Sequence, residues 1–169
     1  MRIETERLTI TEITINEAPF FYELVNDPTY LQFIPDKNIK SIADAKKHIT
    51  NKIIKEYESQ GFGFYLVSLK DSKTPIGMCG LIDRDGLEFM DIGFSFLKEY
   101  QGKGFAFESS KGVLDFAKST LKIDKIAAIT TLDNVKSSNL LERLGFKHER
   151  NIFIPNDPDE LRLFINDLS

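Results

Sequence analysis

A glycine-rich turn is the segment of this sequence whose residue types point most directly to chemistry. It occupies residues 99–108 and contains Gly102 and Gly104. The apolar residues 92–97 before it predict a strand, and apolar residues spaced three and four apart after it predict a helix. Glycine permits positive φ and lets a ligand approach the main chain closely. Because the first N–H groups of a helix lack intrahelical acceptors and lie at its positive end, the turn predicts an anion site, most naturally for a phosphate.

Two common phosphate-binding motifs do not fit this turn. The Walker A motif requires Gly-x-x-x-x-Gly-Lys-Ser/Thr, which the chain lacks. The dinucleotide fingerprint requires a third glycine where Phe107 stands. An ordinary strand-to-helix turn with two glycines remains the alternative.

The charge distribution gives weak support to an anion site. Residues 98–150 contain ten Lys and Arg against seven Asp and Glu, a balance of +3, whereas the rest of the chain has twelve against nineteen, a balance of −7. A cationic field around the turn would favour a polyanionic cofactor, and an acidic field elsewhere would favour a cationic second substrate. The sequence pI of about 5.3 and the lack of an Arg-rich arm argue against nucleic-acid binding.

The composition bounds the class of protein. A chain of 169 residues, 41% hydrophobic and 28% charged, predicts one globular domain over residues 1–169. The single Cys79 excludes an internal disulfide framework and a Cys-based metal site, and His48 and His148 lie too far apart in sequence to support zinc, so no metal is expected. A charged start without a signal peptide, and the absence of a long apolar run, predict a cytoplasmic protein that does not associate with membranes.

The elements that must position the turn follow from apolar periodicity. Three strands joined by short turns precede it and predict an antiparallel meander, which argues against a Rossmann arrangement. A strand reached through the helix after the turn is expected to run parallel to the strand before it. The expected strands are residues 7–13, 64–69, 76–82, 87–97, 125–132, 146–154 and 161–165, and the expected helices are residues 16–25 with Asn16 as the cap, 41–59 with Ser41 as the cap, one from the turn to about 121, and 136–144 ended by Gly145; residues 30–35 are expected to be irregular.

This order of elements, together with Gln101-x-x-Gly104-x-Ala106, resembles the GNAT acetyltransferases. Within that family the chain is similar to the ribosomal-protein N-acetyltransferase branch, the RimJ/RimL type. The resemblance rests on residues 5–8, 101–108, 134–137 and 140–146. The chain departs from that branch at Gln101, where Trp is usual, at Thr11, where Arg is usual, and in a last hairpin shortened around residues 155–158.

The resemblance implies a fold, a reaction and a cofactor. The fold would be α+β, with helices on both faces of a mixed, mostly antiparallel sheet that splays between its fourth and fifth strands. The reaction would be transfer of acetyl from acetyl-CoA to a primary amine by direct attack, and the protein would be a monomer or homodimer. Protein N-termini, polyamines, amino-sugar antibiotics and free amino acids are all possible acceptors.

The resemblance also implies site residues. Main-chain N–H groups of Gln101 to Ala106 would hold the pyrophosphate, and the strand would offer its backbone to the pantetheine arm. Asn134 would contact cofactor or acceptor, although it could be a helix cap, and Ser137 would protonate the leaving thiolate, although Ser138 competes for that role. The implied cofactor-binding residues are Phe94, Ser95, Phe96, Gln101, Gly102, Lys103, Gly104, Phe105, Ala106, Asn134, Ser137, Leu140 and Arg143.

The reaction needs a base for the amine proton and a donor for the oxyanion. Asp91 shares one strand face with Gly93 and Ser95 and is the candidate base, against the alternative of a solvent-facing carboxylate. Glu108, Glu149 and His148 are less favoured bases, and a main-chain N–H of Phe94 or Ser95 is the expected oxyanion donor. Two other functions stay open, a catalytically idle GNAT-fold module that binds CoA or a partner, and a different phosphate-cofactor enzyme on a parallel sheet.

Overall fold

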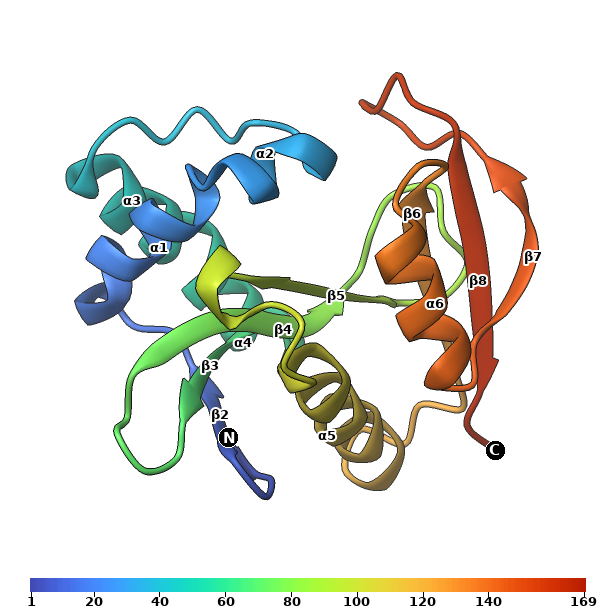
Figure 1. Cartoon of the computed structure of the whole chain (residues 1–169), viewed down its shortest axis with the longest axis horizontal. Coiled ribbons are helices and arrows are strands. Elements are labelled where there is room, and N and C mark those ends of the chain that lie inside the picture. Colours follow the sequence, from blue (N-terminus) through green and yellow to red (C-terminus); the bar gives the residue numbers. More distant parts are fainter.

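Eight strands form one mixed sheet in the computed structural model, which describes all 169 residues (Figure 1). The strands are β1 Arg2–Glu4, β2 Leu8–Glu12, β3 Phe64–Leu69, β4 Pro75–Ile82, β5 Asp91–Phe96, β6 Lys125–Thr131, β7 Lys147–Ile152 and β8 Leu161–Asp167. Their order is β1-β2-β3-β4-β5-β6-β8-β7, and only β5 and β6 pair in parallel. The expected meander, the parallel pair and the α+β class are all confirmed.

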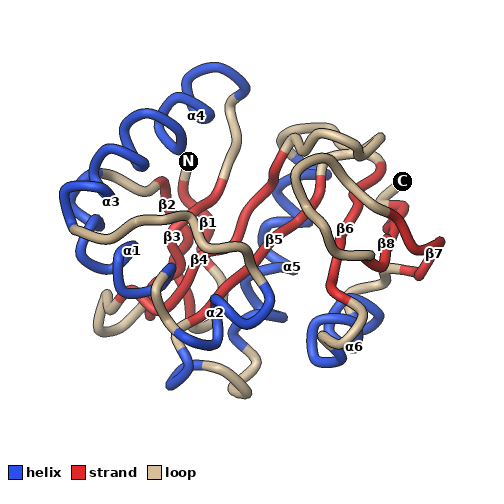
Figure 2. Tube along the Cα trace, turned by 90° about the horizontal axis from the view of Figure 1, so that it is seen from above, coloured by secondary structure: helices blue, strands red, loops and turns tan.

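Helices cover both faces of this sheet. They are α1 Ala18–Val25, α2 Pro28–Phe33, α3 Ile42–His48, α4 Lys55–Gln60, α5 Phe105–Ser119 and α6 Val135–Arg143, with 3₁₀ turns at Ile15–Glu17 and Lys98–Tyr100 and a π-helical segment at Ile49–Ile54 that joins α3 to α4. Figure 2 shows α1 to α4 gathered beside β1 to β5, while α6 accompanies β6, β8 and β7. No helix combines the length and the apolar character that a bilayer crossing would require.

Local capping explains where several helices begin. Ser41 accepts a hydrogen bond from the N–H of Asp44 at 3.0 Å and caps α3 as expected. The cap of the first helical segment is Thr14, not Asn16, because Thr14 and Glu17 form a reciprocal capping box. Residues 28–33 form α2 rather than an irregular stretch, because Asp27 caps the segment and Pro28 is compatible with a first helical turn.

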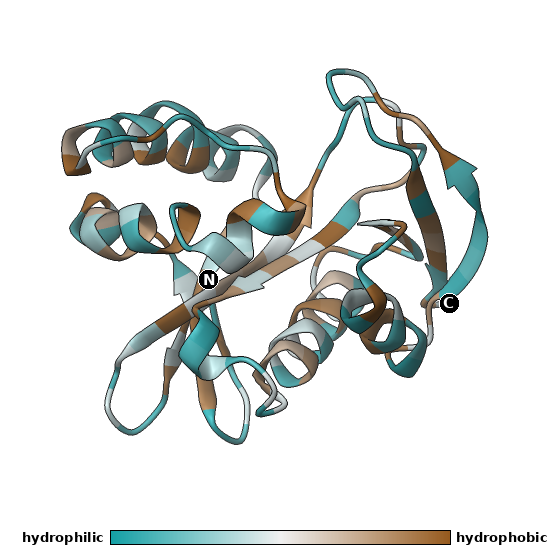
Figure 3. Ribbon diagram, turned by 45° about the horizontal axis from the view of Figure 1, so that its top comes forward, coloured by the Kyte–Doolittle hydropathy of each residue, from teal (hydrophilic) through white to brown (hydrophobic).

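The two faces of the sheet bury separate apolar clusters. One cluster packs α5 and α6 against the sheet and includes Ile92, Val113 and Leu141. The other packs α1 and the α3–α4 helix against the opposite face and includes Phe21 and Leu97. Even-numbered residues of β5 therefore face α5, and odd-numbered residues face α1 to α4. The edge strand β7 is largely hydrophilic and exposed, as Figure 3 shows, which is how natural sheets protect their edges.

The sheet splays between β5 and β6. Six residue pairs join β4 to β5 and seven join β6 to β8, but a single pair, Asp91 with Ala127, joins β5 to β6. The N–H of Ala127 donates to the carbonyl oxygen of Met90 at 2.8 Å at this closed end. Because the two strands are parallel, they part toward their carboxyl ends, where the glycine-rich turn and the start of α6 lie. The splay falls between the fourth and fifth expected strands, as predicted, although the fourth spans only Asp91–Phe96 instead of residues 87–97.

Candidate active site

The main chain of β5 faces the gap with alternate residues. The N–H of Leu97 donates to the carbonyl oxygen of Ile76 in β4 at 3.0 Å. In an antiparallel ladder this assigns the main-chain groups of Ser95 to β4 as well, and it directs those of Phe94 and Phe96 away from β4 into the gap. Of the two expected oxyanion donors, Phe94 therefore has its N–H on the gap side, whereas the N–H of Ser95 is directed to β4.

The glycine-rich turn presents a row of free N–H groups. The N–H groups from Gly102 to Phe107 donate to no protein acceptor, and no side chain caps α5 at Gly104. Gly102 and Gly104 have φ of 73° and 82°, as the sequence predicted. The N–H of Gln101 donates to the carbonyl oxygen of Lys98 at 3.2 Å, so the free row begins one residue later than expected. Six main-chain donors at the positive end of a helix form a site for an anion.

The side chain of Gln101 makes two hydrogen bonds that the sequence did not predict. Its amide nitrogen donates to the carbonyl oxygen of Phe96 at 2.9 Å and to Oγ1 of Thr29 at 3.1 Å. Thr29 is in turn held by the Asp27 cap of α2. Gln101 therefore links β5 and the turn to α2 on the other face of the sheet.

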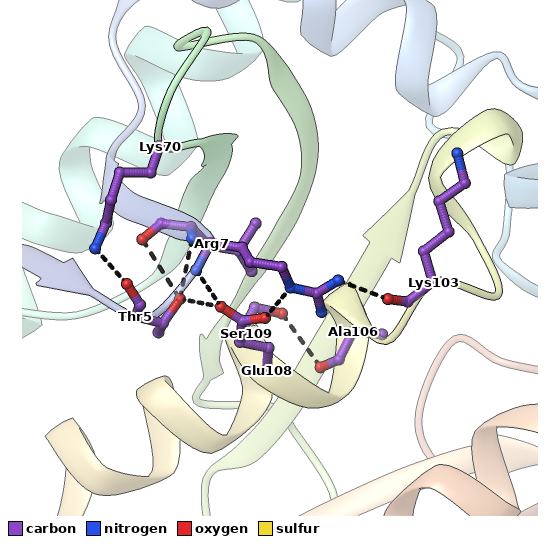
Figure 4. A network of polar contacts seen from close by, with 8 residues as sticks. Thr5, Arg7, Lys70, Lys103, Ala106, Glu108 and Ser109 are labelled. Atoms are coloured by element: carbon purple, nitrogen blue, oxygen red, sulfur yellow. Dashed lines mark hydrogen bonds and ion pairs between the residues drawn. The ribbon is translucent and has the colours of Figure 1, made fainter.

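Arg7 and Glu108 join the start of the chain to the turn (Figure 4). Oε1 of Glu108 accepts from Oγ1 of Thr5 at 2.6 Å and from the N–H of Arg7 at 2.7 Å, and Oε2 accepts from Nε of Arg7 at 2.7 Å. Nη1 of Arg7 donates to the carbonyl oxygen of Lys103 at 3.0 Å, and its guanidinium lies 4.4 Å from the ring centre of Phe105. Burial would raise the pKa of Glu108, but these hydrogen bonds outweigh it and lower the pKa, so Glu108 is a fixed anion and no base.

The two serines of α6 have different surroundings. Ser138 is buried, and its hydroxyl lies 3.3 Å from that of Thr130 in β6. Ser137 is half-buried, and its hydroxyl has no protein partner. Oδ1 of Asn134 accepts from the N–H of Ser137 at 3.2 Å, so Asn134 is the helix cap. Of the two serines, Ser137 is thus the one with a hydroxyl available to a ligand.

The last residue of α6 contacts the first turn of α5. Ser137, Leu140 and Arg143 follow at spacings of three, and the guanidinium of Arg143 lies 4.7 Å from the ring centre of Phe107 in α5. The ammonium of Lys103 lies 5.8 Å from the ring centre of Tyr100 and so stays near the turn. A groove of about 730 Å³ beside α5 includes Gly104, Phe107 and Arg143 in its lining.

Asp91 is the only buried carboxylate of the protein, with 1% of its surface exposed. It stands at the closed end of the splay, where Nε of Arg84 lies 3.2 Å from its Oδ2. Burial raises the pKa of Asp91 to about 6, although Arg84 acts in the opposite direction. The ring of Phe64 covers Gly93 on the same strand face, between Asp91 and Ser95. The alternative of a solvent-facing carboxylate is therefore wrong.

The other sequence candidates for a base lie on the edge strand β7, two strands away from the gap. Glu149 is exposed and lies 2.6 Å from Nη1 of Arg150. A ring nitrogen of the exposed His148 lies 3.0 Å from Oδ1 of Asn151. No group of three or more His, Cys, Asp or Glu side chains is arranged to hold a metal ion.

Comparisons with known proteins agree with this architecture. Residues 7–147 match the acetyltransferase (GNAT) domain family. The N-acetyltransferase YnaD of Bacillus subtilis is 26% identical over 149 residues, which cover 88% of this chain and 84% of that protein. The [ribosomal protein uS5]-alanine N-acetyltransferase of Escherichia coli is 32% identical over 100 residues, 57% of this chain and 52% of that protein.

Solved structures share the fold over the whole chain. A GNAT-family acetyltransferase from Bacillus anthracis superposes with a TM-score of 0.83 at 20% identity, over 99% of both chains. The RimL ribosomal L7/L12 alpha-N-protein acetyltransferase in complex with coenzyme A superposes with a TM-score of 0.84 at 16% identity, over 99% of this chain and 98% of that one. The match over residues 7–147 settles the family: this chain belongs to the GNAT acetyltransferases and is an acetyl-CoA-dependent N-acetyltransferase.

Proposed function

We propose that this N-acetyltransferase acetylates the amino terminus of a protein, with the diphosphate of acetyl-CoA on the free N–H groups from Gly102 to Phe107. The row of six uncapped donors is the observation that carries the cofactor placement. The acceptor class rests on the similarity to the uS5-alanine N-acetyltransferase.

The pantetheine arm would lie in the gap between β5 and β6. Phe94 offers its main-chain N–H and C=O there, as a strand offers them to an added strand. The N–H of Phe96 also faces the gap, but its carbonyl oxygen is bonded to Gln101. The thioester oxygen would lie near the N–H of Phe94, which is positioned to stabilise the tetrahedral oxyanion.

The chemical step is attack of the neutral amine on the thioester carbon. The C–N bond forms, the oxyanion collapses and the C–S bond breaks. The hydroxyl of Ser137 gives its proton to the departing thiolate and regains one from the solvent. Asp91 takes the proton of the amine through water, because the ring of Phe64 separates it from the open part of the strand face.

Charge on the acceptor side favours a single amine over a polyamine. Asp91 is the only buried carboxylate, and Arg84 already pairs with it. A polyamine carries further cationic groups, and no second buried carboxylate is present to pair with them. A protein amino terminus brings one amine and a hydrogen-bonding main chain instead.

The test is release of thiol from acetyl-CoA in the presence of matched acceptors. The set comprises a peptide beginning with Ala, the same peptide with a blocked amino terminus and an internal Lys, spermidine and an amino-sugar antibiotic. We expect turnover with the free peptide and none with the blocked peptide. Turnover with spermidine alone would overturn the acceptor class. No thiol release with any of these amines would favour the catalytically idle CoA-binding module instead.

A further inference from the structure

The start of the chain is bound to the anion turn by a group of side chains that we call the N-terminal clamp. It consists of Thr5, Arg7 and Glu108, together with the carbonyl oxygen of Lys103 (Figure 4). The ammonium of Lys70 in turn donates to the carbonyl oxygen of Thr5. The clamp bridges about one hundred residues of sequence between the start of the chain and the turn.

Glu108 poses an electrostatic problem for this turn. Its carboxylate stands at the start of α5, where it would compete with a bound phosphate for the positive end of the helix. The side chain is 16% exposed, so solvent screens its charge poorly. Nε of Arg7 at 2.7 Å neutralises the carboxylate and directs it toward the β1–β2 turn.

Arg7 also fixes the direction of one peptide group in the turn. Its Nη1 holds the carbonyl oxygen of Lys103 at 3.0 Å. In a trans peptide the following N–H points opposite to the carbonyl, and the chain contains no cis bond. The N–H of Gly104, in the middle of the free row, is therefore aimed away from Arg7. The same guanidinium lies close to Gly104, because its Nη2 would be 3.2 Å from an added Cβ and would have to shift slightly.

We propose that Arg7 is a positioning residue for the diphosphate of acetyl-CoA, acting through the Gly104 N–H and through neutralisation of Glu108. This rests on the cofactor placement proposed above. A merely structural pin between the chain start and α5 would affect every substrate equally. If Arg7 acts on phosphate binding, its loss affects only acetyl donors that carry the diphosphate.

The test compares two acetyl donors, acetyl-CoA and acetyl-pantetheine, which lacks the diphosphate. We expect Arg7→Met to lower kcat/KM for acetyl-CoA about tenfold, chiefly through KM, and to leave kcat/KM for acetyl-pantetheine unchanged. Adding Glu108→Gln should restore about half of that loss on a logarithmic scale, because the uncompensated carboxylate is removed. Arg150→Met, which removes an exposed arginine paired with Glu149 on the edge strand β7, is the matched control and should affect neither donor.

Arg7→Lys keeps a positive charge beside Glu108 but loses the forked geometry, so we expect about a threefold loss with acetyl-CoA alone. This variant preserves the test if Arg7→Met does not fold, which circular dichroism and thermal melting would reveal. Equal losses with both donors, or no recovery in the double variant, would overturn the proposal. Wild-type protein that uses acetyl-pantetheine as well as acetyl-CoA would contradict the cofactor placement itself.

Discussion

The two ends of the gap between β5 and β6 are built on different principles. The open end is made of main-chain groups from one short segment, the N–H row of Gly102 to Phe107, and it is exposed from Gly102 to Gly104. The closed end is made of side chains, the buried Asp91 and its partner Arg84. An anion site follows from local chain geometry, whereas a carboxylate with a raised pKa requires burial by the whole fold.

The sharpest way to separate the ends is to remove the buried carboxylate. Asp91→Asn should lower kcat about 100-fold or more and leave the KM for acetyl-CoA unchanged, because it removes the proposed base without touching the turn. Steady-state kinetics with varied acetyl-CoA measures both constants. Glu149→Gln, on the edge strand, is the control and should have no effect. A KM change at constant kcat would place Asp91 in cofactor binding instead.

The pH dependence sharpens the same point. Because burial raises the pKa of Asp91 to about 6, and a base must be ionised, kcat should rise between pH 5 and pH 7 with a midpoint near 6. The rise should disappear in Asp91→Asn. A wild-type profile that is flat over this range would show that ionisation of Asp91 is irrelevant to the rate.

At the open end, Gly104→Val should weaken CoA binding about 100-fold, since a branched side chain at φ of 82° distorts the N–H row and blocks the phosphate. Isothermal titration calorimetry measures the affinity. Gly61→Val is the matched control, because Gly61 has φ of 80° and open space around it at the end of α4. It should lose stability by a similar amount and keep its CoA affinity; a loss of affinity there would mean that backbone strain alone explains the effect.

Replacing each of the two neighbouring serines of α6 should have a smaller effect, and the two replacements should affect different properties. Ser137→Ala should lower kcat about tenfold through slower thiolate protonation, with little change in stability. Ser138→Ala should instead lower the free energy of unfolding by about 1 kcal/mol, because the buried hydroxyl of Thr130 loses its partner. Rate assays measure kcat and urea unfolding measures stability for both variants. A loss of kcat in Ser138→Ala and a loss of stability in Ser137→Ala would exchange the roles of the two serines.

The smallest expected effect concerns the link across the sheet. Gln101→Leu should lower the free energy of unfolding by about 1 kcal/mol, because the amide no longer bonds Phe96 and Thr29. Urea unfolding measures this, and Gln32→Leu on the exposed side of α2 is the control. Equal stability of the Gln101 variant and the wild type would show that this link contributes nothing.

The sequence predicted best what neighbouring residues determine. The positive φ angles of Gly102 and Gly104, the strand before them and the helix after them all lie within one short stretch. The meander of β3, β4 and β5 also followed, because short turns leave few topologies open. The GNAT family was identified from motifs in the turn and in α6, and the family match over residues 7–147 confirms it.

The sequence predicted poorly what distant segments create. The pairing of Arg7 with Glu108 joins residues far apart in the chain, and nothing local announces it. The motif at residues 5–8 was the only signal. It indicated the resemblance to the family, but it did not predict a contact with the glycine-rich turn. The sequence predicted an irregular stretch at residues 30–35, although Asp27 caps α2 and Pro28 begins it. Asp91 is paired with Arg84 from the loop between β4 and β5, and Phe64 of β3 covers the neighbouring Gly93, so its surroundings come from other elements.

The single Asp91–Ala127 pair has a consequence for the mechanics of the enzyme. With one residue pair between β5 and β6, the two halves of the sheet share almost no hydrogen bonds, and they are held together by the apolar cluster that the sheet forms with α5 and α6. An extended molecule lying in the gap would supply the missing rungs on the β5 side. Binding of acetyl-CoA would then also complete the hydrogen bonding of the sheet, and release of CoA would open it again.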